Sequence, residues 1–490
     1  MDRLGLSLST DSSSDRARDT LAGMMRTALL SFLLAFGVLR AADVRSIDWT
    51  RLNAETLEHF SNLLRIDTSS PPGNESLAVD YLKKVLDKEK IPYQVFTLEK
   101  DRANLVARIK GNGSKRPIIV MGHTDVVGVQ RDKWTVDPFA AIRKDGFIYG
   151  RGANDDKDQL TAALMTVIAI QRAKIPLDRD VIFIAEAGEE GQSRVGIDFL
   201  VNQHWDAIAA EYCIAEGGYI AQRDGKVIYS AVASTEKVPR GVTLTARGIA
   251  GHGSIPRMDN AVAHIAQAVA KLAQWEPPMR LNDTTRTYFE RLASIAPPEE
   301  AQRYKSLFVA EKSASVQQYF RKEEQHHYSI LRTSVVPTMI RAGFRTNVIP
   351  SETSATLDIR ALPDEDIEKF YDQMRAVIDD PQVQLEASRY SMRPAGMPSP
   401  LDSELFRALE KVTRDMFPGA IVLPSMLTGA TDMAQLRAKG VKAYGIGPII
   451  DDKDRTTGGA HSDDERILET GLYKVAEMTL RAVLEVAASK

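Results

Sequence analysis

Short apolar runs alternate with helical segments along the first half of the chain. The runs at 104–109, 117–121, 181–185 and 212–215 are brief, rich in branched side chains and bounded by turn residues, which predicts buried strands. The stretch 154–173 carries apolar residues at helical spacing, and 195–208 is expected to be another helix. Because strands that alternate with helices bury both faces of a sheet, the chain is predicted to be α/β, with a mixed sheet and helices on both faces.

The pattern changes near residue 237, where half-exposed strands replace buried ones. The segment V-T-L-T-A-R at 242–247 alternates apolar and polar residues, as a strand with one solvated face does. The expected elements are strands at 241–247, 335–342, 354–359 and 382–386, and helices at 261–275 and 364–379. This β-α-β-β-α-β order predicts an inserted α+β domain of the ferredoxin-like type. Residues 278–330 are irregular and charged, and His326 and His327 are expected at the surface.

Four segments of the chain follow from these patterns. Residues 47–236 and 393–490 are expected to form one α/β domain in two pieces, with 237–392 inserted between them as the smaller domain. Residues 1–46 are expected to be a leader outside the fold. The length of the chain is consistent with two or three domains.

The leader resembles a secretory signal peptide. Arg26 precedes the apolar run T-A-L-L-S-F-L-L-A-F-G-V-L, and the small residues Ala41 and Ala42 follow it. The run is too short for an ordinary membrane-spanning helix. We therefore expect a secreted or periplasmic protein with no stable membrane span after processing; the alternative is a disordered tail followed by an anchor or a buried helix.

Composition limits the kinds of site that the chain can build. Cys213 is its one cysteine, and a thiolate-built metal site needs several, so any metal must be held by histidines and carboxylates. The formal net charge is -3, without the basic excess of a nucleic-acid-binding protein. We expect no nucleic-acid partner.

The string G-H-T-D at 122–125 directly follows one predicted strand. His123 and Asp125 are two residues apart, so in extended chain their side chains point the same way. The histidine could bind a metal while the carboxylate fixes its ring. The alternative is a buried histidine with satisfied hydrogen bonds.

Further strings of this kind lie after strands or in glycine-rich turns. They are G-R-G-A-N-D-D-K at 150–157, G-E-E-G at 188–191, E-G-G at 216–218 and G-G-A-H-S at 458–462. Carboxylates that open a helix can simply cap it, which is an alternative for the first string. The whole set is expected at one edge of one sheet. Two histidines and three carboxylates there suit two zinc ions with one bridging carboxylate.

The ordered series G-H-T-D, G-R-G-A-x-D-D-K, G-E-E-G, E-G-G and A-H-S resembles one family of di-zinc peptidases. The family includes glutamate carboxypeptidase, succinyl-diaminopimelate desuccinylase, aminoacylase and the yeast vacuolar carboxypeptidase, and the resemblance covers roughly residues 50–490. It implies a catalytic α/β domain with an inserted lid or dimerisation domain. It also implies two Zn²⁺, with Co²⁺ or Mn²⁺ as alternatives, and small peptides or N-acyl amino acids as substrates. A homodimer is a further implication that stays open.

The resemblance assigns a ligand role to five side chains. His123 binds one zinc, His461 binds the other, and Asp155 bridges the two. Glu190 completes the site of His461, and Glu216 completes the site of His123.

The same resemblance assigns catalytic and structural roles near these ligands. Glu189 is the general base, and Asp125 orients His123. The peptide bond between Asp155 and Asp156 is expected to be cis. One departure is Asp158, which stands where the family usually has glycine and adds a negative charge near the helix start.

Four residues are implied in substrate binding. His252 in G-H-G-S matches a histidine that reaches the substrate oxyanion, often from a neighbouring subunit. Asn347 and Arg360 match residues near the substrate carboxylate, and Gly429 opens a substrate loop, G-A-T-D. The alternative for Arg360 is a surface ion pair.

The expected activity is hydrolysis of an amide bond near a free carboxylate, of the carboxypeptidase, dipeptidase or aminoacylase type. Three alternatives stay open: a non-catalytic ligand-binding protein on a peptidase scaffold, a di-zinc aminopeptidase, and a serine hydrolase that uses Ser254. The last lacks the G-x-S-x-G nucleophile motif.

Overall fold

The computed structural model describes residues 1, 47–388, 393–451 and 458–489 and is built around a ten-stranded mixed sheet. The expected signal peptide lies outside the described residues. The strand order is β2-β3-β8-β4-β9-β19-β11-β10-β20, and β18 pairs with β11 beside this path. The strands are β2 (Tyr93–Thr97), β3 (Ala103–Ile109), β4 (Ile118–His123), β8 (Val181–Glu186), β9 (Tyr212–Ala215), β10 (Tyr219–Arg223), β11 (Lys226–Glu236), β18 (Ile421–Leu427), β19 (Lys442–Gly445) and β20 (Ile449–Asp451).

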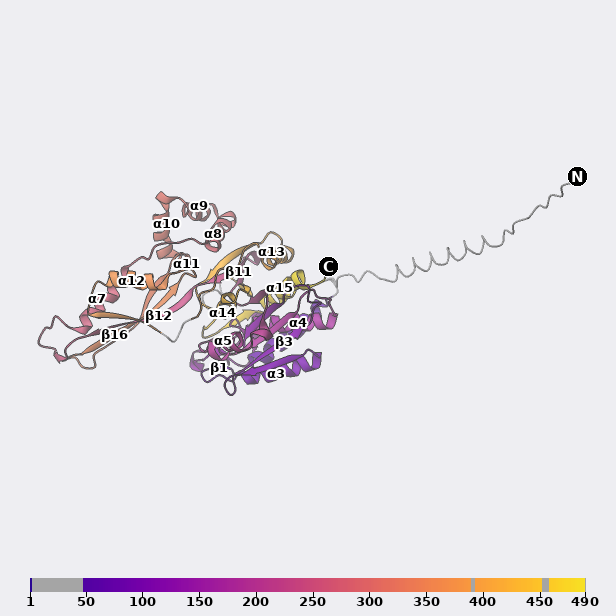
Figure 1. Ribbon diagram of the computed structural model, residues 1–490, viewed down its shortest axis with the longest axis horizontal. Helices are drawn as coiled ribbons and strands as arrows, with labels where there is room; N and C mark the ends of the chain where they lie inside the picture. Colours follow the sequence, from indigo (N-terminus) through magenta and orange to yellow (C-terminus); the bar gives the residue numbers. More distant parts are fainter. Residues whose placement is uncertain (2–46, 389–392, 452–457, 490) are drawn as a thin grey trace.

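Helices cover both faces of this sheet, as predicted (Figure 1). The helices around it are α2 (Trp49–Leu64), α3 (Glu75–Glu89), α4 (Lys157–Ala173), α5 (Ile197–Gln203), α6 (Trp205–Ile208), α13 (Glu404–Met416), α14 (Met433–Ala438) and α15 (Glu469–Ala487). In β4, Ile118 and Val120 join the core that α4, α13 and α15 complete. Ile119 and Met121 join the core under α5 and α14. Both faces of the strand are therefore buried, which is why its sequence is apolar without alternation.

Two expected helices have different limits in the structure. The helix expected at 154–173 begins at Lys157, because the residues before it form a turn. The stretch expected to be one helix at 195–208 is divided into α5 and α6, which meet at His204. Gly196 precedes α5, and a Cβ there would lie 1.8 Å from the carbonyl oxygen of Ala187, so only glycine fits.

A second, four-stranded antiparallel sheet carries the middle of the chain. Its order is β14-β16-β12-β17, formed by β14 (Ser334–Ala342), β16 (Glu352–Ala361), β12 (Val238–Arg247) and β17 (Val383–Ala387). Helices α7 (Ala261–Gln274) and α12 (Ile367–Ile378) pack on it through Ile265 and Met374. Strand β12 starts two residues after β11 ends, so the two sheets are joined by a very short connection. Figure 1 shows this part extending away from the larger sheet.

The expectation of irregular structure at 278–330 is wrong. The segment forms α8 (Asp283–Ile295), α9 (Pro298–Ser306), α10 (Ala310–Glu323) and α11 (Gln325–Ile330). These helices share a small core with Leu423 and Met426 of β18, which anchors them to the larger sheet. Their few apolar residues are widely spaced among charges, so the helical period is weak in the sequence.

The two neighbouring histidines of this segment have different surroundings. His326 is exposed, as expected. The expectation for His327 is wrong, since its side chain is 14% exposed and packs against the rings of Tyr288 and Phe320. His327 is therefore part of the helical core.

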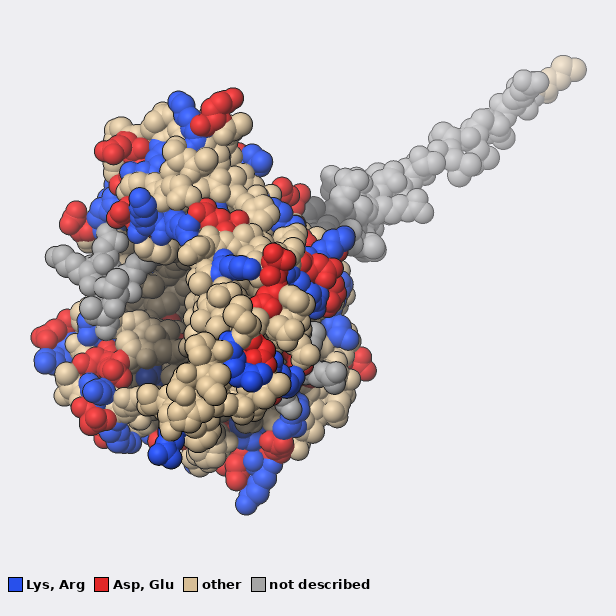
Figure 2. Space-filling view, turned by 90° about the vertical axis from the view of Figure 1, so that its left-hand side faces the viewer, with Lys and Arg blue, Asp and Glu red and all other residues tan. Residues whose placement is uncertain are grey.

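No helix within the described ranges 47–388, 393–451 and 458–489 is long and apolar enough to cross a membrane. On the face shown in Figure 2, acidic and basic side chains are interspersed around a hollow.

Candidate metal centre and active site

The histidine and carboxylate motifs meet at one edge of the ten-stranded sheet. His123 is the last residue of β4, and β4 runs parallel to its neighbours β8 and β9. The loop with Glu189 follows β8, and Glu216 follows β9. The ends of parallel strands lie side by side, so these residues converge as the strand order requires.

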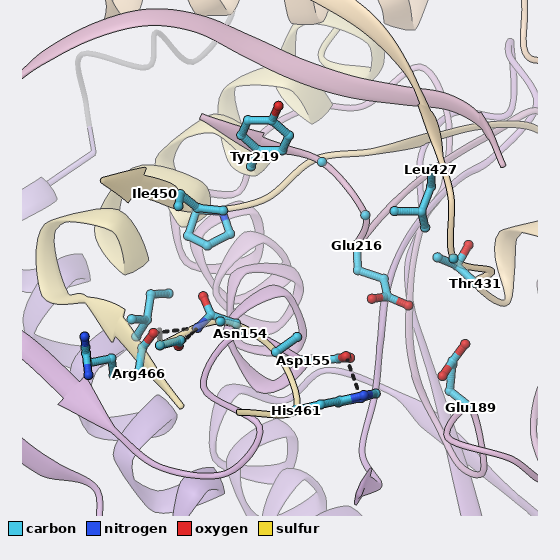
Figure 3. Close-up of a pocket in the computed structure, with 18 of the residues that line it drawn as sticks. Asn154, Asp155, Glu189, Glu216, Tyr219, Leu427, Thr431, Ile450, His461 and Arg466 are labelled. Atoms are coloured by element: carbon cyan, nitrogen blue, oxygen red, sulfur yellow. Dashed lines mark hydrogen bonds and ion pairs between the residues drawn. The ribbon is translucent and has the colours of Figure 1, made fainter. Parts of the chain in front are cut away.

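Asp155 lies between two imidazoles. Its Oδ1 is 2.9 Å from Nε2 of His123. Its Oδ2 is 3.2 Å from Nε2 of His461, a contact that Figure 3 shows. Nε2 of His461 is also 2.9 Å from Oε1 of Glu190. A carboxylate that presents one oxygen to each of two histidines has the arrangement of a bridging ligand in a two-metal site.

The residues present fit divalent cations. Potential ligand atoms of His123, Glu189 and Glu216 lie within 4.8 Å of one another, and so do those of His123, Asp155 and Glu190. Burial raises the pKa of Glu216, and the nearby charges of Asp155 and Glu189 raise it further. Imidazole nitrogens and carboxylate oxygens are ligands that zinc accepts, and bound cations would offset this concentration of negative charge.

The charges of the centre shift the pKa values of its groups. Burial opposes a charge on His123, but hydrogen bonds with Asp125 and Asp155 outweigh it and hold the pKa well above its usual value. Hydrogen bonds to Asp155 and Glu190 raise the pKa of His461 to about 10. Burial opposes ionisation of Asp155, yet the two imidazoles hold its pKa below its usual value. The neighbouring carboxylates therefore stabilise positive charge at the position of the candidate ligands.

Asp125 forms hydrogen bonds with two parts of the centre, which are His123 and the loop that carries Glu189 and Glu190. Nδ1 of His123 is 2.9 Å from the backbone oxygen of Asp125 and 3.6 Å from its carboxylate. The two carboxylate oxygens accept hydrogen bonds of 3.1 Å each from the backbone N–H groups of Glu189 and Glu190. One buried side chain thus sets the position of the loop that carries both glutamates.

Glu465 holds the turn that carries Asp155, a role that the sequence did not reveal. Its buried carboxylate accepts hydrogen bonds from Arg151 at 2.6 Å, from the N–H of Gly152 at 3.1 Å and from the N–H of Asn154 at 2.7 Å. The only sequence signal is its position four residues after His461.

Arg393 is a second functional residue that sequence reasoning missed. Its guanidinium donates a 2.6 Å hydrogen bond to Oε1 of Glu189 and a 2.8 Å hydrogen bond to Oδ1 of Asp432. Burial raises the pKa of Glu189 to about 8, and the charge of Arg393 opposes that rise. Arg393 lies 204 residues from Glu189 in the chain, and no local pattern marks the contact.

The backbone around the ligands has unusual conformations. The peptide bond between Asp155 and Asp156 is cis, as expected. His461 has a φ of 64°, in the left-handed region that L-residues seldom adopt. A left-handed conformation at a residue other than glycine persists where the surrounding structure enforces it, often at active sites. Asp158 is buried at the start of α4, and burial raises its pKa to about 7.

A cavity of about 490 Å³ opens at the centre, between the ligands and the end of β16. Arg360 lines it, and so does Gly429. Nε of Arg360 also pairs with Asp358 at 3.0 Å, so this arginine both faces the cavity and takes part in an ion pair. The volume is in the usual range for small-molecule sites.

His252 and Asn347 lie apart from this cavity. They belong to the tip of the four-stranded sheet, where β13 (Gly251–His252) pairs with β15 (Val348–Ile349). Both residues are exposed, and neither is among the residues that line the cavity. Nδ1 of His252 is 2.7 Å from Oγ of Ser254. The structure brings these two residues to each other but not to the ligands within this chain.

Histidines and carboxylates at the carboxyl edge of an α/β sheet, beside a cavity, define the class of metal-dependent hydrolases. The chain belongs to the peptidase family M20/M25/M40, whose profile matches residues 119–485.

Individual relatives agree with this assignment. The "Probable carboxypeptidase S-like 2" of Dictyostelium discoideum is 30% identical over 339 residues, which are 67% of this chain and 64% of that protein. A "Probable succinyl-diaminopimelate desuccinylase" of Staphylococcus aureus strain Mu50 is 28% identical over 77% of this chain and 86% of its own. The crystal structure of an M20 family metallo-carboxypeptidase from Sulfolobus solfataricus superposes with a TM-score of 0.66 at 20% identity, covering 88% of this chain and 99% of the other, and so shares the fold.

Proposed function

We propose that the protein is a di-zinc hydrolase that cleaves the amide bond of a small peptide or an N-acyl amino acid with a free carboxylate. The observation that carries this proposal is the position of Asp155 between His123 and His461, with Glu189 beside them. His123, Asp155 and Glu216 would hold one cation, and His461, Asp155 and Glu190 the other. Cobalt and manganese are alternatives to zinc, since N/O sites accept several divalent metals.

Glu189 is the residue that moves the proton in this account. When bound, two divalent cations lower the pKa of a water and polarise the substrate carbonyl. Oε of Glu189 takes a proton from the attacking water and later delivers it to the nitrogen of the leaving amine. Arg393 holds the carboxylate through Oε1, and Asp125 holds its backbone. The base is thereby fixed in position before the substrate arrives.

Arg360 is the proposed partner of the substrate carboxylate. It belongs to β16 of the four-stranded sheet and lines the same cavity as Asp155, Glu190, Glu216 and His461. Its guanidinium is partly neutralised through Nε by Asp358, and its side chain remains 34% exposed. A guanidinium pairs well with a carboxylate, which supports a substrate with a free carboxyl group.

We also propose that the four-stranded sheet, a ferredoxin-like unit, acts as a lid and dimerisation domain. Edge strand β14 exposes the apolar side chains of Val336, Met339 and Ile340 at 50%, 47% and 55%. An exposed apolar edge strand favours pairing with a second copy. Such a dimer could bring His252 of the partner subunit to the cavity. A monomer in sedimentation equilibrium at micromolar concentration would contradict this part.

A substrate panel tests the proposed activity. We expect the zinc-loaded protein to hydrolyse dipeptides or N-acyl amino acids, and to lose that activity when the substrate's carboxyl group is amidated. A requirement for a free amino group instead would favour an aminopeptidase. No hydrolysis from a protein that holds two metals would favour a non-catalytic binding protein.

Export is a separate proposal that rests on the leader sequence. The apolar run after Arg26 and the small residues behind it predict removal of the leader during secretion. N-terminal sequencing of the protein from its own host tests it. An intact N-terminus on cytoplasmic protein would contradict export.

A further inference from the structure

We propose that Glu236 is a positioning residue, which holds the G-A-T-D loop at residues 429–432 in the wall of the cavity and thereby sets the affinity for substrate. The proposal rests on the proposed function and adds a residue to it. Glu236 is the last residue of β11, and β12 begins at Val238, so the side chain lies at the connection between the two sheets. Glu236 is only 6% exposed and is not among the residues that line the cavity. It therefore acts on substrate only through the loop.

Both carboxylate oxygens of Glu236 are bound to one residue of this loop. Oε1 accepts a hydrogen bond of 3.0 Å from the backbone N–H of Thr431, and Oε2 accepts one of 2.8 Å from the hydroxyl of Thr431. The sheet brings the two residues together, because β11 runs parallel to β18 and pairs Glu236 with Leu427. The backbone N–H of Lys237 also donates to the backbone oxygen of Leu427 at 2.9 Å. The chain is thus held on both sides of residues 429 and 430.

The part of the loop between these two anchors faces the cavity. Gly429 and Ala430 line it together with Arg360, the proposed partner of the substrate carboxylate. Figure 3 shows the anchors Leu427 and Thr431 near each other at one side of this cavity. In the described part of the chain, neither Gly429 nor Ala430 makes a hydrogen bond of its own. Their position therefore depends on the anchors at Leu427 and Thr431.

A buried arginine completes the contact. Nη1 of Arg437, in α14, donates a hydrogen bond of 2.7 Å to Oε2 of Glu236, and its Nη2 donates to the backbone oxygen of Ala443 at 2.9 Å. The hydroxyl of Thr431 also accepts a hydrogen bond of 3.2 Å from the N–H of Met433, the first residue of α14. Hydrogen bonds to a charged group are about twice as strong as neutral ones. Glu236→Gln therefore keeps the size of the side chain but weakens its hold on the loop.

The next residue of the loop has a different anchor. Asp432 accepts a hydrogen bond of 2.8 Å from Arg393, and Arg393 also holds Glu189, the proposed base. Two successive residues of one loop are therefore held by two separate side chains. We assign Arg393 to the position of the base and Glu236 to the position of the cavity wall. Loss of the Glu236 carboxylate should then weaken substrate binding more than turnover.

The kinetics of Glu236→Gln test this assignment. The substrate is the one that the zinc-loaded wild type hydrolyses best among dipeptides and N-acyl amino acids. We expect KM to rise about tenfold and kcat to stay within about threefold, because the hydrogen bonds to the charged group are each of about this strength. Bound zinc should equal that of the wild type. An unchanged KM, or a loss confined to kcat, would overturn the proposal.

The matched control is Glu211→Gln. Glu211 pairs with buried Arg179 at 3.2 Å, directly before β9, whereas Glu216 follows the other end of that strand. The control makes the same change in a carboxylate paired with a buried arginine, but at the opposite edge of the sheet. It should have the KM of the wild type, and a tenfold rise in this control would show that the effect is not specific to Glu236.

A second pair of variants tests whether Glu236 acts through Thr431. Thr431→Val removes the hydroxyl that binds Oε2 of Glu236, and Thr431→Ser keeps it. We expect Thr431→Val to raise KM and Thr431→Ser to stay near the wild type. Since the two residues would act as a unit, adding Glu236→Gln to Thr431→Val should raise KM only about threefold further. A further rise of about tenfold would show that Glu236 acts by another route and would overturn the proposal.

The threonine variants also decide the matter if Glu236→Gln fails to fold by circular dichroism. Equal KM values for Thr431→Val and Thr431→Ser would then overturn the proposal. Failure of the proposed function has a different signature, which is the absence of hydrolysis by wild-type protein that holds two zinc ions.

Discussion

Arg393 donates a hydrogen bond of 2.6 Å to Oε1 of Glu189, the proposed general base. The same guanidinium donates to the backbone oxygen of Glu189 at 3.0 Å and to Asp432 at 2.8 Å. The backbone oxygen of Arg393 accepts a 2.9 Å hydrogen bond from Arg240 of β12. Arg393 therefore links the proposed base to Arg240 of the four-stranded sheet.

Arg393 is thus a positioning residue, and its loss should affect turnover more than binding. We expect Arg393→Met to lower kcat about 100-fold while KM changes little, because a misplaced base costs about this much. Arg393→Lys should recover part of the loss. Added guanidinium ion should also restore activity to Arg393→Met.

The matched control is Arg143→Met, which removes an exposed arginine paired with Glu469 at 2.8 Å. It should have wild-type kinetics. Zinc content, measured by elemental analysis, should be equal in all variants. If Arg393→Met lost zinc, or if its KM and not its kcat changed, the positioning role would be wrong.

Glu189→Gln tests the base itself. The amide keeps the size of the side chain but cannot accept the proton, so kcat should fall about 10²–10⁴-fold. Both metals should remain, because each proposed site keeps a histidine, the bridging Asp155 and one further glutamate. Measuring kcat and zinc content on the same sample of Glu189→Gln tests both expectations. An active variant would show that another group takes the proton.

Replacing Glu465, which is not itself a proposed metal ligand, should destabilise the fold. Glu465→Ala leaves the guanidinium of Arg151, 2% exposed as a residue, and the N–H groups of Gly152 and Asn154 without their acceptor. Breaking a buried ion pair by removing one partner costs about 3–5 kcal/mol of the free energy of unfolding. Urea denaturation should show this loss, and zinc affinity should fall because Asp155 is held by the same turn. A change below about 1 kcal/mol would contradict the role of Glu465.

Lys237 lies in the connection between β11 and β12. It should make the free energy of unfolding depend on pH. Burial, with smaller contributions from the charges of Arg360 and Arg332, lowers the pKa of Lys237 from 10.5 to about 7. Its Nζ donates to the backbone oxygen of Ser329 and to Oγ of Ser334. Asp358 is the nearby charge that opposes the shift.

The folded state therefore binds fewer protons at Lys237 than the unfolded state between about pH 7 and pH 10.5. In that window, this residue makes the free energy of unfolding rise with pH, by up to about 1.4 kcal/mol per pH unit. Lys237→Met should remove that contribution. The difference in the free energy of unfolding between wild type and variant should therefore change between about pH 7 and pH 10.5. The prediction would be refuted if denaturant titrations gave free energies of unfolding for wild type and Lys237→Met that changed with pH in parallel.

The large sheet and the position of the candidate ligands could be predicted because both have local signals. Buried strands such as β4 and β8 are short and apolar, and the end of a strand tells where a following residue such as His123 will lie. The strands and helices expected for the four-stranded sheet are present in the expected order, but α8 to α11 and the short strands β13 and β15 lie between them.

What the sequence did not reveal depends on contacts between distant segments. Helices α8 to α11 have little apolar periodicity of their own and are stabilised by packing on β18. Arg393 and Glu465 act on groups 204 and 314 residues away in the chain. The motif around His252 was visible, but its distance from the cavity follows from the three-dimensional arrangement of the two sheets.

Metal removal and restoration test the central claim most directly. The protein is stripped with a chelator, and zinc is returned stepwise while hydrolysis of an N-acyl amino acid and bound zinc are measured together. The account predicts no activity in the stripped protein and full activity at two zinc ions per chain. Asp155→Ala should reach neither full activity nor two bound zinc ions. Undiminished hydrolysis by protein that elemental analysis finds free of metal would contradict the account.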